Sequence, residues 1–224
     1  MSRRLVIAID GPSGAGKSTA GRALARQLGY TFLDTGAMYR ALALKALREG
    51  VSLDVPEKLA DLARRTRIDL DGGGEVVRLD GEDVTTAIRT REVSAAASRV
   101  SVHPPVRRLM VARQQELGRT GGVVLDGRDV GTVVFPDADV KFYVDADPRR
   151  RAERRHAELA AAGVASDVDA IEREIRARDH ADSTRSDSPL TRAPDAIYLD
   201  STVLGAEEVV RRMAAAVQEK LFTA

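Results

Sequence analysis

Short apolar runs of strand length alternate with segments of helical spacing at the start of the chain. Residues 5–9 form a continuous apolar run, and the apolar residues of 18–28 fall on one face of a helix that ends at Gly29. A second strand is predicted at 30–33 and a second helix at 37–48. A strand that is apolar throughout is typical of the centre of a parallel sheet. This order of elements predicts a doubly wound α/β fold.

The alternation breaks after the second helix. Two strand-like pieces at 68–70 and 76–79 flank the turn sequence Asp-Gly-Gly-Gly at 71–74, which predicts an antiparallel hairpin outside the parallel sheet. We therefore expect residues 36–105 to form an insertion with its own small sheet and helices.

The α/β pattern resumes after the insertion. The further predicted elements are a helix at 105–117, strands at 123–126, 140–144 and 196–199, helices at 147–162 and 167–181, and a last helix at 206–221. Together with the first two strands, these predict a three-layer α/β core with a five-stranded parallel sheet flanked by helices.

One glycine-rich segment carries a specific signal. Residues 11–18 read Gly-Pro-Ser-Gly-Ala-Gly-Lys-Ser and match the phosphate-loop pattern G-x-x-x-x-G-K-[ST] at every position, between a predicted strand and a predicted helix. The glycines let successive amide groups face one anion, and the helix N-terminus adds partial positive charge. Lys17 can then reach the β- and γ-phosphates, and the Ser18 hydroxyl can hold Mg²⁺. We predict that a nucleoside triphosphate binds to Gly11, Pro12, Ser13, Gly14, Ala15, Gly16, Lys17, Ser18 and Thr19.

Arginines and carboxylates follow two other predicted strands. Thr35 and Arg40 come after the second strand, and Arg128 and Asp129 come after the strand that ends at Asp126. The carboxyl ends of parallel strands meet at one edge of a sheet, so these residues lie near the phosphate loop. Two arginines at that edge favour an anionic partner such as a nucleoside monophosphate over simple surface ion pairs. The position of Asp126 at a strand end suits it to orient Mg²⁺ through water.

Two more basic segments lie in the predicted helices. Arg178, Asp182 and Arg185 are four and three residues apart, so they share a helical face, although a salt-bridge ladder has the same pattern. Five arginines, at 149–151 and 154–155, begin another helix. Aromatic residues for base stacking are not interleaved with them, so a helical pair that folds over a triphosphate is favoured over a nucleic-acid patch.

Composition narrows the classes of protein further. The chain has 224 residues, with Lys+Arg 35 against Asp+Glu 34 and a net charge of +1, which favours neither a nucleic-acid nor a membrane partner. Cysteine is absent, which excludes disulfides and thiolate chemistry. Asparagine is absent too, which excludes the guanine-reading N-K-x-D of switch GTPases. With no leader and no apolar run near 18 residues, we expect a soluble cytoplasmic protein, and a monomer.

Several segments together resemble the bacterial cytidylate kinases, a branch of the P-loop nucleoside monophosphate kinases. The similar segments are 7–19 (IAIDGPSGAGKST), 33–40 (LDTGAMYR), 126–138 (DGRDVGTVVFPDA), 178–185 (RDHADSTR) and 193–202 (APDAIYLDST). The resemblance runs from about residue 5 to residue 221. It implies a core of residues 1–35, 106–146 and 166–224, a CMP-binding insertion at 36–105 and a mobile lid at 147–165.

The resemblance also implies roles for individual residues. Those implied to hold the phosphate of CMP are Arg40 and Arg128, those implied to read cytosine are Thr35, Arg107, Asp129 and Arg185, and those implied to hold the sugar are Ser98, Arg178 and Asp182. Arg150, Arg154 and Arg155 are the lid candidates for the transferring phosphoryl group. Lys17, Arg128, Arg178 and Arg154 form the expected catalytic set, with Ser18 and Asp126 toward the metal. Many relatives carry serine at the position of Thr35, and the hydroxyl is kept here.

The expected reaction is reversible, Mg²⁺-dependent transfer of the ATP γ-phosphoryl group to CMP or dCMP. Cytosine carries an N4 amino donor where uracil carries a carbonyl, so Asp129 or Thr35 as acceptor selects cytosine. The alternatives are a kinase for UMP, AMP or shikimate, and an ATP-dependent regulatory or nucleic-acid-associated P-loop protein that transfers no phosphoryl group to a small molecule.

Overall fold

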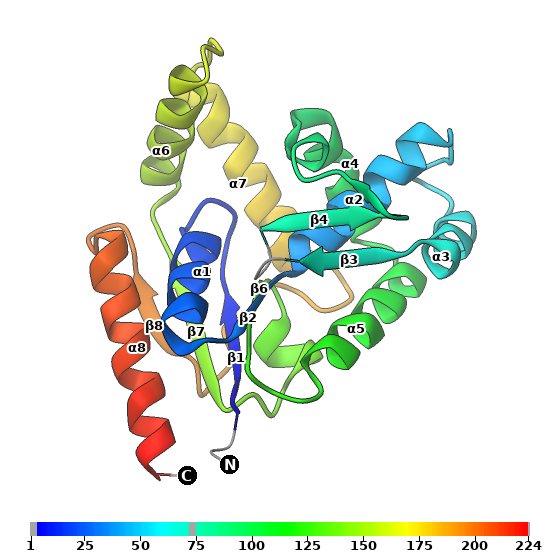
Figure 1. Cartoon of the computed structure of the whole chain (residues 1–224). Helices are drawn as coiled ribbons and strands as arrows, with labels where there is room; N and C mark the ends of the chain where they lie inside the picture. The colour runs from blue at the N-terminus through cyan, green and yellow to red at the C-terminus, as the bar shows by residue number, and fades with distance from the viewer. Residues whose placement is uncertain (1–3, 72–74, 224) are drawn as a thin grey trace.

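The fold is built on a five-stranded parallel sheet with helices on both faces (Figure 1). The computed structural model describes residues 4–71 and 75–223. The strand order is β2-β6-β1-β7-β8, and every neighbouring pair is parallel. The predicted fold class is therefore confirmed. The strands are β1 (Val6–Asp10), β2 (Thr31–Asp34), β6 (Val123–Gly127), β7 (Val140–Asp145) and β8 (Ile197–Asp200).

The central strand β1 is buried on both faces, as its continuous apolar run predicts. Ile7 and Ile9 pack in a cluster with α1 (Lys17–Leu28) and α8 (Ala206–Thr223), which cover one face. Ala8 belongs to a second cluster, against which Val111 of α5 packs. That helix, Pro104–Gly118, and a π-helical turn at Val130–Val134 cover the other face.

The segment predicted as an insertion, residues 36–105, contains a second sheet and supplies most of one apolar cluster. Its hairpin is antiparallel, as predicted, and its turn at 72–74 lies outside the described residues. A third, two-residue strand pairs with the hairpin and was not predicted. Helices α2 and α4 pack together over an apolar cluster that also takes in Val106 and Met110 of α5. The elements are α2 (Thr35–Arg48), α3 (Pro56–Arg65), β3 (Ile68–Asp71), β4 (Val76–Leu79), β5 (Glu82–Asp83), a 3₁₀ turn (Ala87–Arg89) and α4 (Arg91–Val100).

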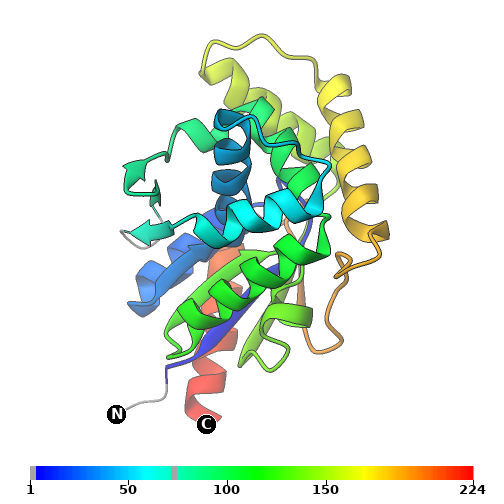
Figure 2. The same cartoon turned by 90° about the vertical axis from the view of Figure 1, so that its right-hand side faces the viewer.

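Two helices form a hairpin that rises from the carboxyl edge of the parallel sheet (Figure 1, Figure 2). They are α6 (Pro148–Ala161) and α7 (Val168–Thr184), and they pack along one another. Each begins at an aspartate, Asp147 or Asp167, whose carboxylate accepts hydrogen bonds from the first free amides of the helix. We refer to this pair as the helical hairpin. It contains the predicted lid.

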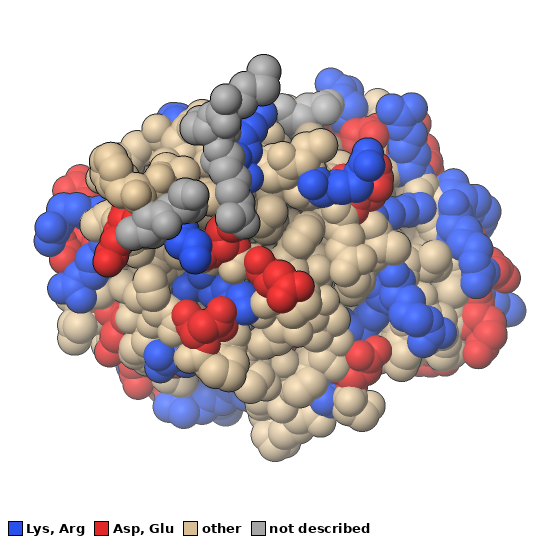
Figure 3. All heavy atoms as spheres, turned by 90° about the horizontal axis from the view of Figure 1, so that it is seen from below, with Lys and Arg blue, Asp and Glu red and all other residues tan. Residues whose placement is uncertain are grey.

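The opposite end of the molecule has a mixed surface. Figure 3 looks at the end away from the helical hairpin and shows basic and acidic side chains next to one another around a largely uncharged middle. This intermixing agrees with a net charge of +1. In residues 4–71 and 75–223, no helix is both long and apolar enough to span a bilayer.

Replacement of Gly11 by alanine is expected to lower the free energy of unfolding by about 3 kcal/mol or more. Its φ is 143°, and an added Cβ would lie 1.9 Å from the Val144 carbonyl oxygen. Gly163 is the matched control, because its φ is 73° but a Cβ there meets nothing within 4 Å. Gly163→Ala should cost only about 1 kcal/mol. Urea unfolding of both variants measures the difference, and equal losses would contradict the predicted clash.

Candidate functional site

The phosphate loop, residues 11–18, joins β1 to α1 at the carboxyl edge of the sheet. Gly14 and Gly16 have φ values of 77° and 86°, in the left-handed region that favours glycine. Gly16 is also the N-cap of α1, and it has no side chain to block the first turn. The loop therefore has the strand–loop–helix setting that an anion-binding turn needs.

Three carbonyl groups of the loop accept hydrogen bonds from side chains. Lys17 Nζ donates to the Pro12 carbonyl at 2.6 Å, Arg151 Nη1 donates to the Ser13 carbonyl at 3.0 Å, and Ser201 Oγ donates to the Ala15 carbonyl at 2.9 Å. These three contacts restrain the backbone of the loop, and with it the amide groups that lie between the carbonyls.

Lys17 and Ser18 lie beside a buried carboxylate, Asp126, at the end of β6. The Ser18 hydroxyl donates a hydrogen bond to this carboxylate. Burial raises the pKa of Asp126, and the neighbouring Asp34 adds to that rise. Burial and the nearby Arg128 lower the pKa of Lys17, while Asp126 opposes that change. Positively charged side chains and carboxylates thus lie close to one another at this site.

Asp10, at the end of β1, fixes the segment that follows β6. Its carboxylate accepts hydrogen bonds from the amides of Val130 at 2.8 Å and Gly131 at 2.7 Å. Burial raises the pKa of Asp10 to about 6, and the two amide donors limit the rise. Asp10 was not among the predicted site residues. Its position directly before Gly11 was the available signal.

On α2, directly after the second strand, Thr35 and Arg40 are both engaged with neighbouring residues. The Thr35 hydroxyl donates to the Asp126 carbonyl at 2.7 Å, which leaves its oxygen free only to accept. Arg40 Nη2 donates to the Asp34 carboxylate at 2.8 Å. The other oxygen of Asp34 caps α2 by accepting from the Ala37 amide.

Arg107, Asp129 and Arg185 form one buried group. Arg107 donates to the Asp129 carboxylate, and Arg185 Nη2 lies 3.7 Å from the other oxygen of that carboxylate. Burial raises the pKa of Asp129 above its ordinary value, although both arginines oppose the rise. The guanidinium of Arg107 lies 6.0 Å from the ring centre of Tyr39. Three elements of the fold, α5, the turn after β6 and the end of α7, thus meet at Asp129.

Arg128, Arg178 and Asp182 form a second group. Arg128 Nε donates to the Asp182 carboxylate at 2.8 Å. Burial acts to raise the pKa of Asp182, but Arg128 holds it below its ordinary value. Burial and the positive charge of Arg128 lower the pKa of Arg178 to about 10. The positive charge of Arg40 also lowers the pKa of Arg178, so Arg40 of α2 and Arg178 of α7 lie within electrostatic range of each other.

Several of these arginines have a buried nitrogen that lacks a hydrogen-bond partner among the described residues. Buried polar atoms are nearly always paired, so such a set calls for a ligand. Guanidinium groups crowded together in this way are stabilised by an anion. The atoms are Nε of Arg40, Nε of Arg107, Nε of Arg178 and Nη2 of Arg185.

The predicted lid arginines behave differently from one another. Arg154 donates to the carbonyl of Ser201 at 2.5 Å and to its hydroxyl at 3.3 Å, next to the phosphate loop. Arg150 pairs with Glu153 and Arg155 with Glu158, each on its own exposed helical face. In this conformation only Arg154 of the three lies at the loop.

Two further residues complete the comparison with the sequence predictions. Ser98, predicted to touch the sugar, is half-buried on α4 in the insertion. Arg151 was not selected, yet it is the buried arginine of the run at 149–151 and contacts the phosphate loop directly. No feature of the sequence distinguished it from the other four arginines of this helix.

The chain is similar in sequence to known proteins over most of its length. A sequence profile described as "Cytidylate kinase" matches residues 7–219. A protein of that name from Solibacter usitatus is 51% identical over 209 residues, which is 92% of this chain and 89% of its own. Another from Geobacillus sp. (strain WCH70) is 48% identical over 223 residues, 99% of this chain and 100% of its own. A shikimate kinase structure from Bacteroides thetaiotaomicron aligns with a TM-score of 0.49 and 15% identity, over 96% of this chain and 98% of that one.

Proposed function

The chain belongs to the cytidylate kinase family and is a kinase with cytidylate kinase activity, and we propose that it transfers the γ-phosphoryl group of ATP reversibly to CMP or dCMP with Mg²⁺. The observation that carries the assignment of the site is the set of buried nitrogens in Arg40, Arg107, Arg178 and Arg185 that have no hydrogen-bond partner among the described residues. A nucleoside monophosphate offers a dianionic phosphate and several sugar and base acceptors to such a set.

The phosphate of the acceptor is assigned to Arg40 and Arg128. Arg40 already donates a hydrogen bond to Asp34, and Arg128 donates one to Asp182. Each contact fixes the plane of the guanidinium group. The remaining N–H groups of each guanidinium can then bind phosphate oxygens with little further loss of side-chain entropy. Arg178, Asp182 and Ser98 are assigned to the sugar.

The base is assigned to the pocket of Thr35, Arg107, Asp129 and Arg185. The hydroxyl proton of Thr35 is committed to the Asp126 carbonyl, so the oxygen can only accept a hydrogen bond. The N4 amino group of cytosine supplies a matching donor, whereas O4 of uracil would face an acceptor. Leaving that oxygen unpaired in a buried site costs about 1–3 kcal/mol, a roughly fivefold to 150-fold preference for cytosine.

The donor triphosphate is assigned to the phosphate loop and Lys17. The paired oxygens of Ser18 and Asp126 are hard ligands, and they fit Mg²⁺, which takes one or two protein oxygens together with phosphates and water. The bound ion would neutralise charge on the β- and γ-phosphates. Ser18 would hold it directly and Asp126 through water.

The chemical step needs no covalent intermediate. An oxygen of the CMP phosphate attacks the γ-phosphorus, and the bond from that phosphorus to the β–γ bridging oxygen breaks, giving CDP and ADP. Lys17, Arg128 and Arg178 stabilise the charge on the transferring group and hold the two nucleotides in line. Arg154 lies at Ser201, beside the loop, and is assigned to join them when the helical hairpin closes and excludes water.

The test is ADP production from ATP and Mg²⁺ with CMP, dCMP, UMP, AMP, GMP, shikimate or no acceptor. We expect fast turnover with CMP and dCMP, and kcat/KM for UMP lower by about fivefold to 150-fold, the ratio that an unpaired buried acceptor gives. Equal rates with CMP and UMP would contradict the role of Thr35 and Asp129. A slow rate that is indifferent to the acceptor would contradict the proposed transfer itself.

A further inference from the structure

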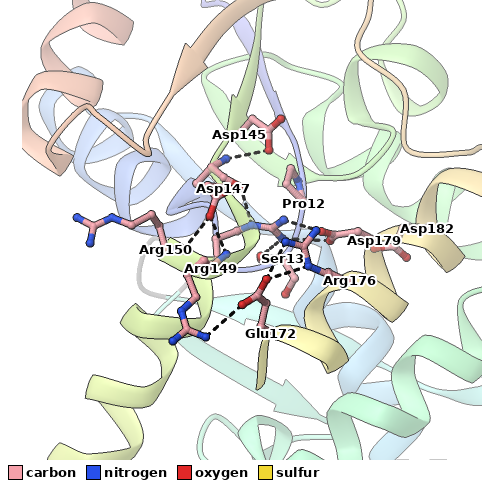
Figure 4. A network of polar contacts seen from close by, with 12 residues as sticks. Pro12, Ser13, Asp145, Asp147, Arg149, Arg150, Glu172, Arg176, Asp179 and Asp182 are labelled. Carbon is pink, nitrogen blue, oxygen red and sulfur yellow. Dashed lines mark hydrogen bonds and ion pairs between the residues drawn. The ribbon is translucent and has the colours of Figure 1, made fainter. Parts of the chain in front are cut away.

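Arg151 is a buried junction between three segments that are distant in sequence. Only 3% of its surface is exposed. Its Nε donates to the Ala146 carbonyl at 2.8 Å, just after β7, and its Nη1 donates to the Ser13 carbonyl of the phosphate loop at 3.0 Å. Figure 4 shows Ser13 of the loop and Asp179 of α7 within one network of polar contacts.

The third partner is Asp179, whose carboxylate accepts hydrogen bonds from both terminal nitrogens of Arg151. Nη1 lies 3.1 Å from one carboxylate oxygen and Nη2 lies 2.5 Å from the other. This two-point contact fixes the guanidinium plane against the carboxylate. A displacement of Asp179 therefore moves the guanidinium group, and with it the donor that holds the Ser13 carbonyl.

Asp179 is also rigidly connected to the arginine groups of the acceptor site. It lies on α7 directly after Arg178 and three residues before Asp182, whose carboxylate pairs with Arg128. The helix thus presents acceptor-side residues in one direction and the partner of Arg151 in another. A ligand that pulls on Arg178 or Asp182 shifts the same helical turn that carries Asp179.

A second arginine–carboxylate contact between the same two helices provides a comparison. Arg149 of α6 pairs with Asp169 and with Glu172 of α7, but 46% of its side chain is exposed. Exposed pairs contribute little to stability because water screens them. Arg149 is not among the residues that hold the loop carbonyls, so this outer pair joins the helices without reaching the loop.

We propose that Arg151 and Asp179 are positioning residues that couple the acceptor site on α7 to the phosphate loop. The inference rests on the proposed function, since it takes CMP at α7 and ATP at the loop. CMP fixes the position of α7 and therefore of Asp179. Through Arg151, Asp179 then fixes the position of the Ser13 carbonyl, and the loop amides become better placed for the triphosphate. By thermodynamic reciprocity, ATP raises the affinity for CMP by the same factor.

Isothermal titration of CMP, with and without a saturating non-hydrolysable ATP analogue and Mg²⁺, measures this coupling factor. For the unmodified protein we expect a factor of about tenfold, within the usual range for coupled sites. In Asp179→Asn and in Arg151→Lys it should fall to about twofold or less, because a neutral amide or a single ammonium cannot keep the two-point contact and the loop contact together. The affinity for CMP alone should change by less than about threefold.

The control is Glu172→Gln, which removes one of the two carboxylates of the outer contact on the same helix. Its coupling factor should equal that of the unmodified protein. Melting temperature and circular dichroism report whether each variant folds. If Arg151→Lys does not fold, the Asp179→Asn protein alone tests the inference. A full coupling factor in a folded Asp179→Asn protein would overturn the inference, as would a factor of one in the unmodified protein. Failure of the unmodified protein to bind CMP or the ATP analogue would instead overturn the proposed function.

Discussion

Replacement of Lys17 by alanine is expected to lower kcat about a hundredfold to a thousandfold with the fold intact, the usual loss for removing one charge-stabilising donor. Its ammonium group is anchored at 2.6 Å to the Pro12 carbonyl, inside the loop that would bind the triphosphate. Burial and Arg128 lower the pKa of Lys17, and the negative charge of a bound polyphosphate would oppose that change. Alanine removes the one positive charge that the loop itself supplies to the β- and γ-phosphates.

Steady-state assays with CMP and ATP measure this loss, and circular dichroism checks the fold. Lys58→Ala is the matched control, because Lys58 is exposed on α3 in the insertion and its loss should leave kcat within about twofold, as for ordinary surface changes. Turnover of the Lys17→Ala protein within a few fold of normal would remove Lys17 from the chemical step.

The phosphate loop and the parallel sheet could be predicted because their signals are local. The run at 5–9 is apolar on both faces, and the structure places Ile7 and Ala8 in different clusters on opposite sides of the sheet. The pattern at 11–18 depends on backbone conformations that glycine permits, and Gly14 and Gly16 do adopt positive φ. In both cases the nearest neighbours in sequence decide the structure.

Side-chain partners across the fold could not be predicted in the same way. From sequence, five arginines in α6 are equivalent, yet Arg151 is buried on the loop while Arg150 and Arg155 pair with glutamates of their own helix. The choice depends on how α6 rotates against α7 and on Asp179, which is 28 residues away. The two-residue strand β5 is similar, because two exposed acidic residues carry no strand signal and pair only because the hairpin offers an edge.

The direction of the Thr35 hydroxyl is a third example. Sequence places a hydroxyl at the start of α2 but cannot say whether it donates or accepts toward a base. The structure commits its proton to the carbonyl of Asp126, 91 residues away on a neighbouring strand. The expected discrimination between cytosine and uracil depends on that tertiary contact.

Replacement of Arg128 by lysine is expected to lower kcat/KM for CMP about a hundredfold, while KM for ATP changes by less than about threefold. A hydrogen bond to a charged group is worth about 1.5–3 kcal/mol, and lysine lacks the planar guanidinium group that makes two such bonds at once. Arg128 donates through Nε to Asp182 at 2.8 Å and through Nη1 to the Gly127 carbonyl at 3.2 Å. An ammonium that binds the phosphate of CMP must leave Asp182 without its partner.

The comparison of lysine with alanine at this position separates charge from geometry. Arg128→Ala removes both, and it leaves the carboxylate of Asp182, which is 14% exposed, without the contact that holds its pKa down, so its loss should exceed that of lysine by about tenfold or more. Arg48→Lys is the control, because Arg48 makes a similar fork with Glu82 on the exposed surface of the insertion. If lysine at 128 kept most of the kcat/KM for CMP, a positive charge alone would suffice there, and the planar fork held by Asp182 would have no part in binding the acceptor. The expected order, arginine above lysine above alanine, follows only if Asp182 and the acceptor phosphate are held by one guanidinium group at the same time.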